Sequence, residues 1–113
     1  DSLIVLTTGG KRTSQALFNN RGVQLTDFVY IVIDKFYEGL AKARIGDKFG
    51  FIYPNGKIAI PISFEYCEVF KNGHAKKKKK EKWGAIDKKG NIILKTNYTH
   101  DEVEKILKEK YGS

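Results

Sequence analysis

The chain has 113 residues, of which 41% are hydrophobic, and it carries a formal net charge of +8. This length and composition predict one folded domain with a modest core and exclude a disordered chain. No apolar run approaches the roughly eighteen residues of a membrane-spanning helix, and the single cysteine excludes an internal disulfide framework and a thiolate zinc cluster. We therefore expect a soluble protein and leave its compartment open. Because the sequence starts at Asp1 and lacks methionine, we expect an N-terminus that is truncated or processed.

The chain opens with the apolar run LIVL at residues 3–6 and the segment QALFNNRGVQL at residues 15–25. Residues 40–60 then alternate apolar and polar side chains, and many of them are aromatic or β-branched, as is typical of β-strands. We predict strands over residues 40–45, 49–53 and 57–60. Turns are predicted at Gly46-Asp47 and Asn55-Gly56, where residues that break strands occur.

The same pattern returns 34 residues later. KFGFIYPNGKIAI from Lys48 aligns without a gap on KWGAIDKKGNIIL from Lys82, so that Phe49-Gly50 matches Trp83-Gly84 (83 − 49 = 34). Gly22, Gly56 and Gly90 share this spacing. We predict three tandem repeats, approximately residues 1–27, 28–61 and 62–98, of which the first is the most divergent.

The turn glycines have a structural explanation. The residues that precede them are Arg21, Asn55 and Lys89. A type I′ turn would force these residues into positive φ, whereas a type I turn followed by a glycine bulge requires positive φ only at the glycine. We therefore predict bulged hairpins at Gly22, Gly56 and Gly90, with no phosphate to bind.

Gly50 and Gly84 lie inside predicted strands, where a glycine indicates that something large passes close to the backbone. The aromatic rings of Phe49, Trp83 or a neighbouring repeat are the expected occupants. We therefore interpret Phe49 and Trp83 as packing anchors between repeats. The alternative for Trp83 is a platform on which a ligand stacks.

A specific resemblance follows from the last copy of the pattern. Aromatic-x-x-Gly-x-Ala, followed by Lys-Trp-Gly-x-Ile-Asp-x-x-Gly-x-Ile-Ile, resembles the WG-repeat family, whose KWG-type tandem arrays occur mostly in bacterial proteins. The pattern is carried by Phe70, Gly73, Ala75, Lys82, Trp83, Gly84, Ile86, Asp87, Gly90, Ile92 and Ile93. The resemblance implies a non-catalytic scaffold for protein–protein interaction, as a module of a larger bacterial protein. Its expected partner is another protein or other modules of the same chain.

Residues 99–113 break the repeat and predict a helix. Thr99 is a suitable N-cap with Glu102 three residues later, and Gly112 is a suitable stop. The expected apolar stripe of this helix consists of Val103, Ile106, Leu107 and Tyr111. The predicted fold class is therefore mainly β: an antiparallel β-meander of three tandem repeats with a C-terminal capping α-helix.

Residues suited to catalysis are few. His74 and His100 have no metal-ligand spacing to Cys67 or to each other, and we expect both histidines at the surface. We expect Cys67 to be a buried, inert thiol. The sequence contains no phosphate-binding loop, dinucleotide fingerprint or nucleophile motif. We predict no enzyme activity, no catalytic or metal-binding residue, no cofactor and no small-molecule substrate.

The positive charge is concentrated in one segment. Residues 71–95 contain ten lysines and two acidic residues, which give +8 (10 − 2), so the rest of the chain sums to zero. The expected location is a sheet edge or a protruding hairpin, where lysines prevent edge-to-edge pairing of sheets. The alternative is a binding site for nucleic acid, anionic lipid or an acidic protein. Its candidate residues are Lys76, Lys77, Lys78, Lys79, Lys80 and Lys82.

Overall fold

The computed structural model describes residues 2–10 and 13–112, which form ten strands and one helix. This confirms the predicted mainly β fold with one C-terminal helix. None of the described residues belongs to a helix with the length and apolar character needed to cross a bilayer. The elements are β1 (Leu3–Thr7), β2 (Gln15–Asn19), β3 (Val32–Tyr37), β4 (Leu40–Ile45), β5 (Lys48–Ile52), β6 (Ile58–Phe64), β7 (Tyr66–Cys67), β8 (His74–Lys79), β9 (Lys82–Asp87), β10 (Ile92–Tyr98) and α1 (His100–Tyr111).

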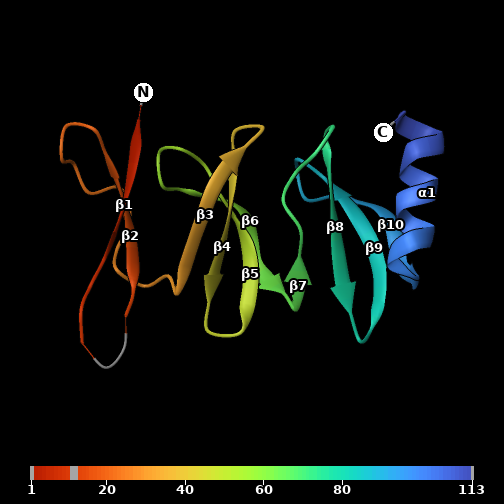
Figure 1. The fold of residues 1–113 in the computed structure, drawn as a ribbon, viewed down its shortest axis with the longest axis horizontal. Coiled ribbons are helices and arrows are strands. Elements are labelled where there is room, and N and C mark those ends of the chain that lie inside the picture. Colours follow the sequence, from red (N-terminus) through yellow and green to blue (C-terminus); the bar gives the residue numbers. More distant parts are fainter. Residues whose placement is uncertain (1, 11–12, 113) are drawn as a thin grey trace.

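The strands form three antiparallel sheets that stand in a row (Figure 1). The first sheet pairs β1 with β2, the second contains β3 to β6 in chain order, and the third contains β7 to β10 in chain order. The molecule measures 43 Å along its longest axis and 18 Å along its shortest, with β1 near one end and α1 at the other. The predicted meander is thus divided into three consecutive sheets.

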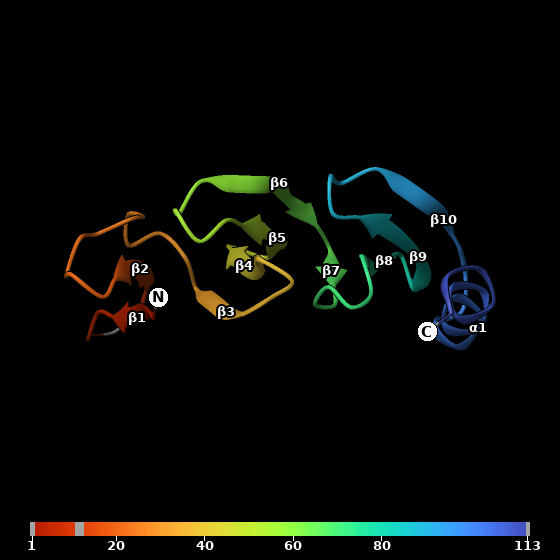
Figure 2. The same cartoon turned by 90° about the horizontal axis from the view of Figure 1, so that it is seen from above.

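The second and third sheets are built alike. Each strand of the third sheet starts 34 residues after its counterpart in the second (66 − 32 = 34 for the first pair). We call residues 32–64 unit two and residues 66–98 unit three. Seen from above, β6 and β10 run along the same side of the row (Figure 2).

The first predicted copy is only partly equivalent to these units. β2 and its turn correspond to β5 and β9 with their turns, because Asn19 lies 34 residues before Tyr53 (53 − 19 = 34). β2 pairs with β1 in a two-stranded sheet, and after the turn the chain returns to β2 through two isolated bridges. These bridges, Phe18–Gln24 and Gln15–Tyr30, lie one period before the pairs Ile52–Ile58 and Phe49–Phe64 of β5 and β6. The first copy therefore repeats this strand, its turn and the two bridges of the returning chain, but among residues 2–10 and 13–31 the returning chain forms no strand like β6 or β10.

The turns after β2, β5 and β9 share one geometry. In each, the glycine N–H donates to the carbonyl oxygen three residues earlier over 2.9–3.1 Å, and the glycine has a φ of 81–88°. The preceding residues, Arg21, Asn55 and Lys89, are not in positive φ. Each turn is therefore a type I turn followed by a glycine bulge, as predicted.

The aspartate of the repeat pattern holds the turn together. Asp87 Oδ1 accepts N–H hydrogen bonds from Lys89 and Asn91, both at 2.9 Å. Asn19 Oδ1 has the same role two periods earlier, in the first copy, where it accepts the N–H groups of Arg21 and Val23 at 2.9 and 3.0 Å. Burial alone would raise the pKa of Asp87, but the hydrogen bonds from Asn91 and Lys89 together lower it.

Gly50 and Gly84 lie against the backbone of the following strand. A Cβ on Gly50 would lie 2.6 Å from the carbonyl oxygen of Pro61. A Cβ on Gly84 would meet the carbonyl oxygen of Leu94 and lie 2.8 Å from the carbonyl carbon of Lys95. The expectation that an aromatic ring fills this space is wrong, because the backbone of β6 or β10 occupies it.

The central buried cluster is shared by units two and three. Leu40, Phe51 and Ile60 contribute from unit two, and Phe70 and Ile86 contribute from unit three. Phe51 is fully buried, and its ring centre lies 4.7 Å from that of Phe70. A second cluster joins β2 to unit two, and a third lies beneath α1. Because the central cluster draws on both units, burial of apolar surface holds them together.

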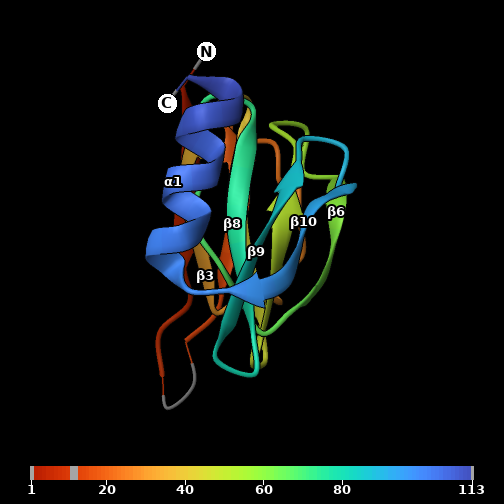
Figure 3. The same cartoon turned by 90° about the vertical axis from the view of Figure 1, so that its right-hand side faces the viewer.

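Helix α1 covers the end of the row beside β8 and β9 (Figure 3). The Thr99 hydroxyl accepts the Glu102 N–H at 3.1 Å, and the Glu102 carboxylate accepts the Thr99 N–H at 2.8 Å. Gly112 ends the helix with a φ of 79°. Val103 and Leu107 are buried beneath it. These contacts confirm the predicted capping helix, including its capping box and its stop.

The two-residue turn between β8 and β9 is strained. Lys80 and Glu81 have φ values of 49° and 68°, a pair of positive values that favours Asn-Gly. The double substitution Lys80→Asn, Glu81→Gly is expected to raise the free energy of unfolding by about 1–2 kcal/mol, because left-handed backbone is costly for other residues. Urea denaturation measures this change. Glu81→Ala removes the charge and keeps the strain, so it should be nearly neutral; equal effects of both variants would contradict the turn geometry.

Candidate interaction face

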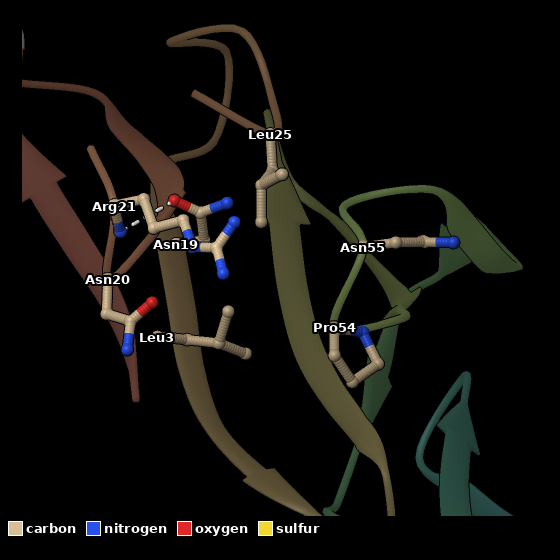
Figure 4. A pocket seen from close by; sticks show the side chains of 7 residues that line it. All are labelled: Leu3, Asn19, Asn20, Arg21, Leu25, Pro54 and Asn55. Carbon is tan, nitrogen blue, oxygen red and sulfur yellow. Dashed lines mark hydrogen bonds between the residues drawn. The ribbon is translucent and has the colours of Figure 1, made fainter. Parts of the chain in front are cut away.

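The hollow between the turns of the first copy and unit two lacks reactive side chains. It has a volume of about 580 Å³ and no carboxylate, histidine or cysteine in its lining. The Asn19 amide oxygen there is held by the Arg21 N–H at 2.9 Å. No group of three or more His, Cys, Asp or Glu that could hold a metal ion occurs among residues 2–10 and 13–112. The hollow is lined by Leu3, Asn19, Asn20, Arg21, Leu25, Pro54 and Asn55 (Figure 4).

Cys67 is buried in the cluster that units two and three share. Its side chain is fully covered, and this burial raises the pKa of the thiol to about 12. At neutral pH the sulfur is therefore protonated and a poor nucleophile. Lys42 lies close by and donates from Nζ to the Cys67 carbonyl oxygen at 3.1 Å, so the lysine contacts the backbone and not the sulfur.

His74 is buried, and its predicted surface position is wrong. Only 7% of the residue is exposed, its ring lies 5.3 Å from that of Tyr111, and its buried Nε2 has no hydrogen-bond partner. Burial, followed by the positive charge of Lys76, lowers the pKa of His74. The repeat alignment could have predicted this burial, because His74 is equivalent to Leu40 (74 − 34 = 40), which is buried as well.

Acidification is expected to destabilise the protein through His74. Because its pKa in the folded state lies below 6.5, the unfolded chain takes up the proton first, and stability falls as the pH drops through about 6.5. Glu104 acts at lower pH, because Lys76 lowers its pKa in the folded state. Its contribution to the free energy of unfolding is lost as the carboxylate takes up a proton below about pH 4.5. His74→Leu should remove the first loss and keep the second, as measured by urea denaturation across pH. Identical pH profiles for the variant and the parent would contradict this role.

Aromatic side chains of units two and three meet along one half-exposed row. Phe49 and Tyr66 pack edge to face with ring centres 5.3 Å apart, and one period later Trp83 and His100 do so at 4.7 Å. Tyr66 and Trp83 link the two pairs at 6.1 Å. We call these four residues the aromatic stripe. Phe49 and Trp83 thus have equivalent neighbours, and Trp83 also packs against the cluster beneath α1.

Cationic side chains stand over the rings of the aromatic stripe. The Arg44 guanidinium lies 5.6 Å from the Phe49 ring centre, and Lys78, one period later, lies 5.8 Å from the Trp83 ring centre. Lys42 Nζ lies 4.9 Å from the Tyr66 ring centre. These distances allow the attraction between a cation and the face of an aromatic ring. The stripe is therefore an alternating series of rings and cations.

Lys76 already has acidic partners within the fold. Its Nζ lies 2.8 Å from Glu104 and 3.4 Å from Glu68, and Lys42 pairs with Asp34 at the equivalent place in unit two. Burial alone would lower the pKa of Lys76, but the hydrogen bond to Glu104 and the charge of Glu68 raise it. Of the six predicted anion-binding lysines, Lys76 is thus the one held between carboxylates.

The other five candidate lysines do not share one environment. Lys78 faces the aromatic stripe, whereas Lys77 Nζ lies 5.6 Å from the Phe64 ring centre. Lys79, Lys80 and Lys82 are exposed around the hairpin turn. β8 pairs with β9 along its whole length and with β7 at Lys77 and Lys78, so the first predicted location of the lysine run, a sheet edge, is wrong. The other predicted location, a protruding hairpin, stays a prediction.

Several residues of this face were missed by sequence reasoning. Tyr66 and His100 are one period apart (100 − 66 = 34), as are Asp34 and Glu68 (68 − 34 = 34), so extending the alignment by position would have found them. Glu104 lies on α1 outside the repeat, and the repeat contains no signal for its contact with Lys76.

The sequence matches the model of a known family, described as WG containing repeat, over residues 49–83 and 83–100. The matches begin at Phe49 and Trp83, the second residues of the equivalent strands β5 and β9. No curated protein and no solved structure matches the chain.

Proposed function

Residues 49–100 of the chain belong to the WG-repeat family, and from this premise we propose that the chain is a non-catalytic module that binds another protein through the aromatic stripe. Tandem repeats of this kind offer extended surfaces to partners. The observation that supports the proposal is the single half-exposed row of rings and cations, drawn from β4, β5, β7, β8, β9 and α1.

The residue types of the stripe are those that dominate protein interfaces. Tryptophan, tyrosine and arginine are enriched among interface residues with large energetic effects. Phe49 and Trp83 are held on paired strands, so binding would order few side chains and lose little entropy. Within the described residues, Arg44 and Lys78 have no carboxylate within ion-pair distance. A partner with carboxylates opposite these two cations would fit the face.

A matched pair of variants tests this function. Arg44→Ser with Tyr66→Ser alters the stripe, whereas Lys57→Ser with Tyr53→Ser also removes one cation and one tyrosine, but from the exposed turn at the far end of β5. The parent chain captures partners from nuclease-treated cell extract, and calorimetry then measures the affinity of the purified partner for each variant. We expect the stripe variant to bind at least about tenfold more weakly and the control to bind as the parent does. Equal affinities, or turnover of a small molecule in place of partner binding, would contradict the proposal.

A further inference from the structure

A basic cleft lies between units two and three. It has a volume of about 400 Å³, which is in the range of sites for small organic ligands. The end of β6 and the start of β5 form one side, and β8 forms the other. We define the basic cleft by its lining residues Lys48, Ser63, Phe64, Glu65, Lys77, Lys78 and Lys79.

The charges of the basic cleft are unbalanced. Four lysines and one glutamate line it. Lys78 Nζ lies over the Tyr66 and Trp83 rings of the aromatic stripe, and the Glu65 carboxylate accepts the backbone N–H of Lys80 at 3.2 Å. In the part of the chain that the structure describes, none of the four lysines lies within ion-pair distance of an acidic group. An anion that enters the cleft would therefore meet cations that have not been neutralised.

The neighbouring residues Lys76 and Lys77 differ in whether their ammonium groups have acidic partners. Both are half-buried, but Lys76 contacts two carboxylates and Lys77 contacts the ring of Phe64. Burial, followed by the charge of Lys79, lowers the pKa of Lys77, whereas the carboxylates raise that of Lys76. Keeping a half-buried ammonium group without an acid destabilises the free protein, and a bound anion would relieve this cost.

The repeat shows that the lysines are not demanded by the fold. One period earlier, the positions of Ser63, Phe64, Glu65, Lys77 and Lys79 hold apolar residues. These are Val29, Tyr30, Ile31, Ala43 and Ile45. Blocking of edge pairing does not explain the lysines either, because β8 has a neighbour on each side. Unit three thus holds cations at places where an equivalent strand pair folds with apolar side chains.

We propose that the basic cleft binds the phosphates of a single-stranded nucleic acid. Cations along a groove that also contains an aromatic ring, here Phe64, are the usual combination for such a strand. Lys77 is recessed, so a flat anionic membrane reaches it poorly, whereas a flexible strand can enter the cleft. This inference goes beyond the proposed function. Its test alters Lys77 and Lys79, whereas the protein-binding test alters Arg44 and Tyr66. The nucleic-acid proposal and the protein-binding proposal can therefore be refuted independently.

Fluorescence anisotropy of a labelled thymidine oligonucleotide of about 16 nucleotides tests the inference with the full chain. Lys77→Ser with Lys79→Ser removes two cleft charges. Lys88→Ser with Lys89→Ser removes the same charge from the exposed turn at the other end of β9. At about 50 mM salt we expect the cleft variant to bind the oligonucleotide at least tenfold more weakly than the control. The slope of the logarithm of the binding constant against the logarithm of the salt concentration should be smaller in magnitude by roughly 1.4 than for the parent, because two lysines no longer contact phosphates. In the parent, NMR titration should show the pKa of Lys77 rising on binding.

Three results would overturn the inference. The first is no binding at low salt, and the second is equal weakening of binding by the two variants. The third is equally tight binding of polyglutamate or of anionic lipid vesicles, which would assign the cleft to an acidic protein or a membrane. Circular dichroism checks that both variants are folded. The cleft variant should be at least as stable as the parent, because it loses a half-buried charge without an acidic partner.

Discussion

Gly84→Ala is expected to lower the free energy of unfolding by about 3 kcal/mol, a cost at the upper end for overpacking. The added methyl group would meet the carbonyl oxygen of Leu94 and the backbone of Lys95. These are main-chain atoms of β10, which pairs with β9, so relief requires the two strands to separate. Gly50→Ala should cost a similar amount, because the backbone of β6 lies over Gly50 in the same way.

Gly73→Ala is the matched control for this prediction. Gly73 has a φ of 87°, and no atom would lie within 4 Å of an added Cβ. Its substitution should therefore cost only the backbone strain of about 1–2 kcal/mol. Urea denaturation of the three variants separates the two effects. If Gly84→Ala were no more destabilising than Gly73→Ala, the close approach of β10 to β9 would be contradicted.

Leu107→Ala is expected to destabilise the protein by about 3 kcal/mol, since it leaves a cavity beneath α1. Leu107 is 2% exposed and belongs to the cluster that contains Val103 and Ala85, with Trp83 packed against it. The neighbouring Ile106 is only half-buried, so Ile106→Ala should cost about 1 kcal/mol. Thermal unfolding followed by Trp83 fluorescence measures both changes. Equal costs would show that α1 does not dock through the Leu107 side.

Features set by local interactions could be predicted from the sequence. The capping box of Thr99 and Glu102 and the glycine bulge at Gly90 both depend on residues within four positions of each other. The spacing of the glycines and aromatic residues gave the 34-residue period, and this period places equivalent strands in units two and three. Local signals thus predicted the fold class and the C-terminal helix.

Features set by contacts between distant segments could not be predicted in the same way. The Lys76–Glu104 pair depends on how α1 docks, and the backbone over Gly84 belongs to β10. β7 has only two residues, too short to stand out in the sequence, yet its pairing keeps β8 from being an edge strand. These contacts decide which lysines are paired with acids and which line the basic cleft.

The coupling energy between Phe51 and Phe70 tests most directly whether units two and three share one core. Phe51→Leu, Phe70→Leu and the double variant form a cycle whose unfolding free energies are measured in urea. The structure predicts a favourable coupling of about 0.5–1.5 kcal/mol, because the two rings meet edge to face across the boundary between the units. Additive effects, with a coupling near zero, would show that the units do not pack together as described.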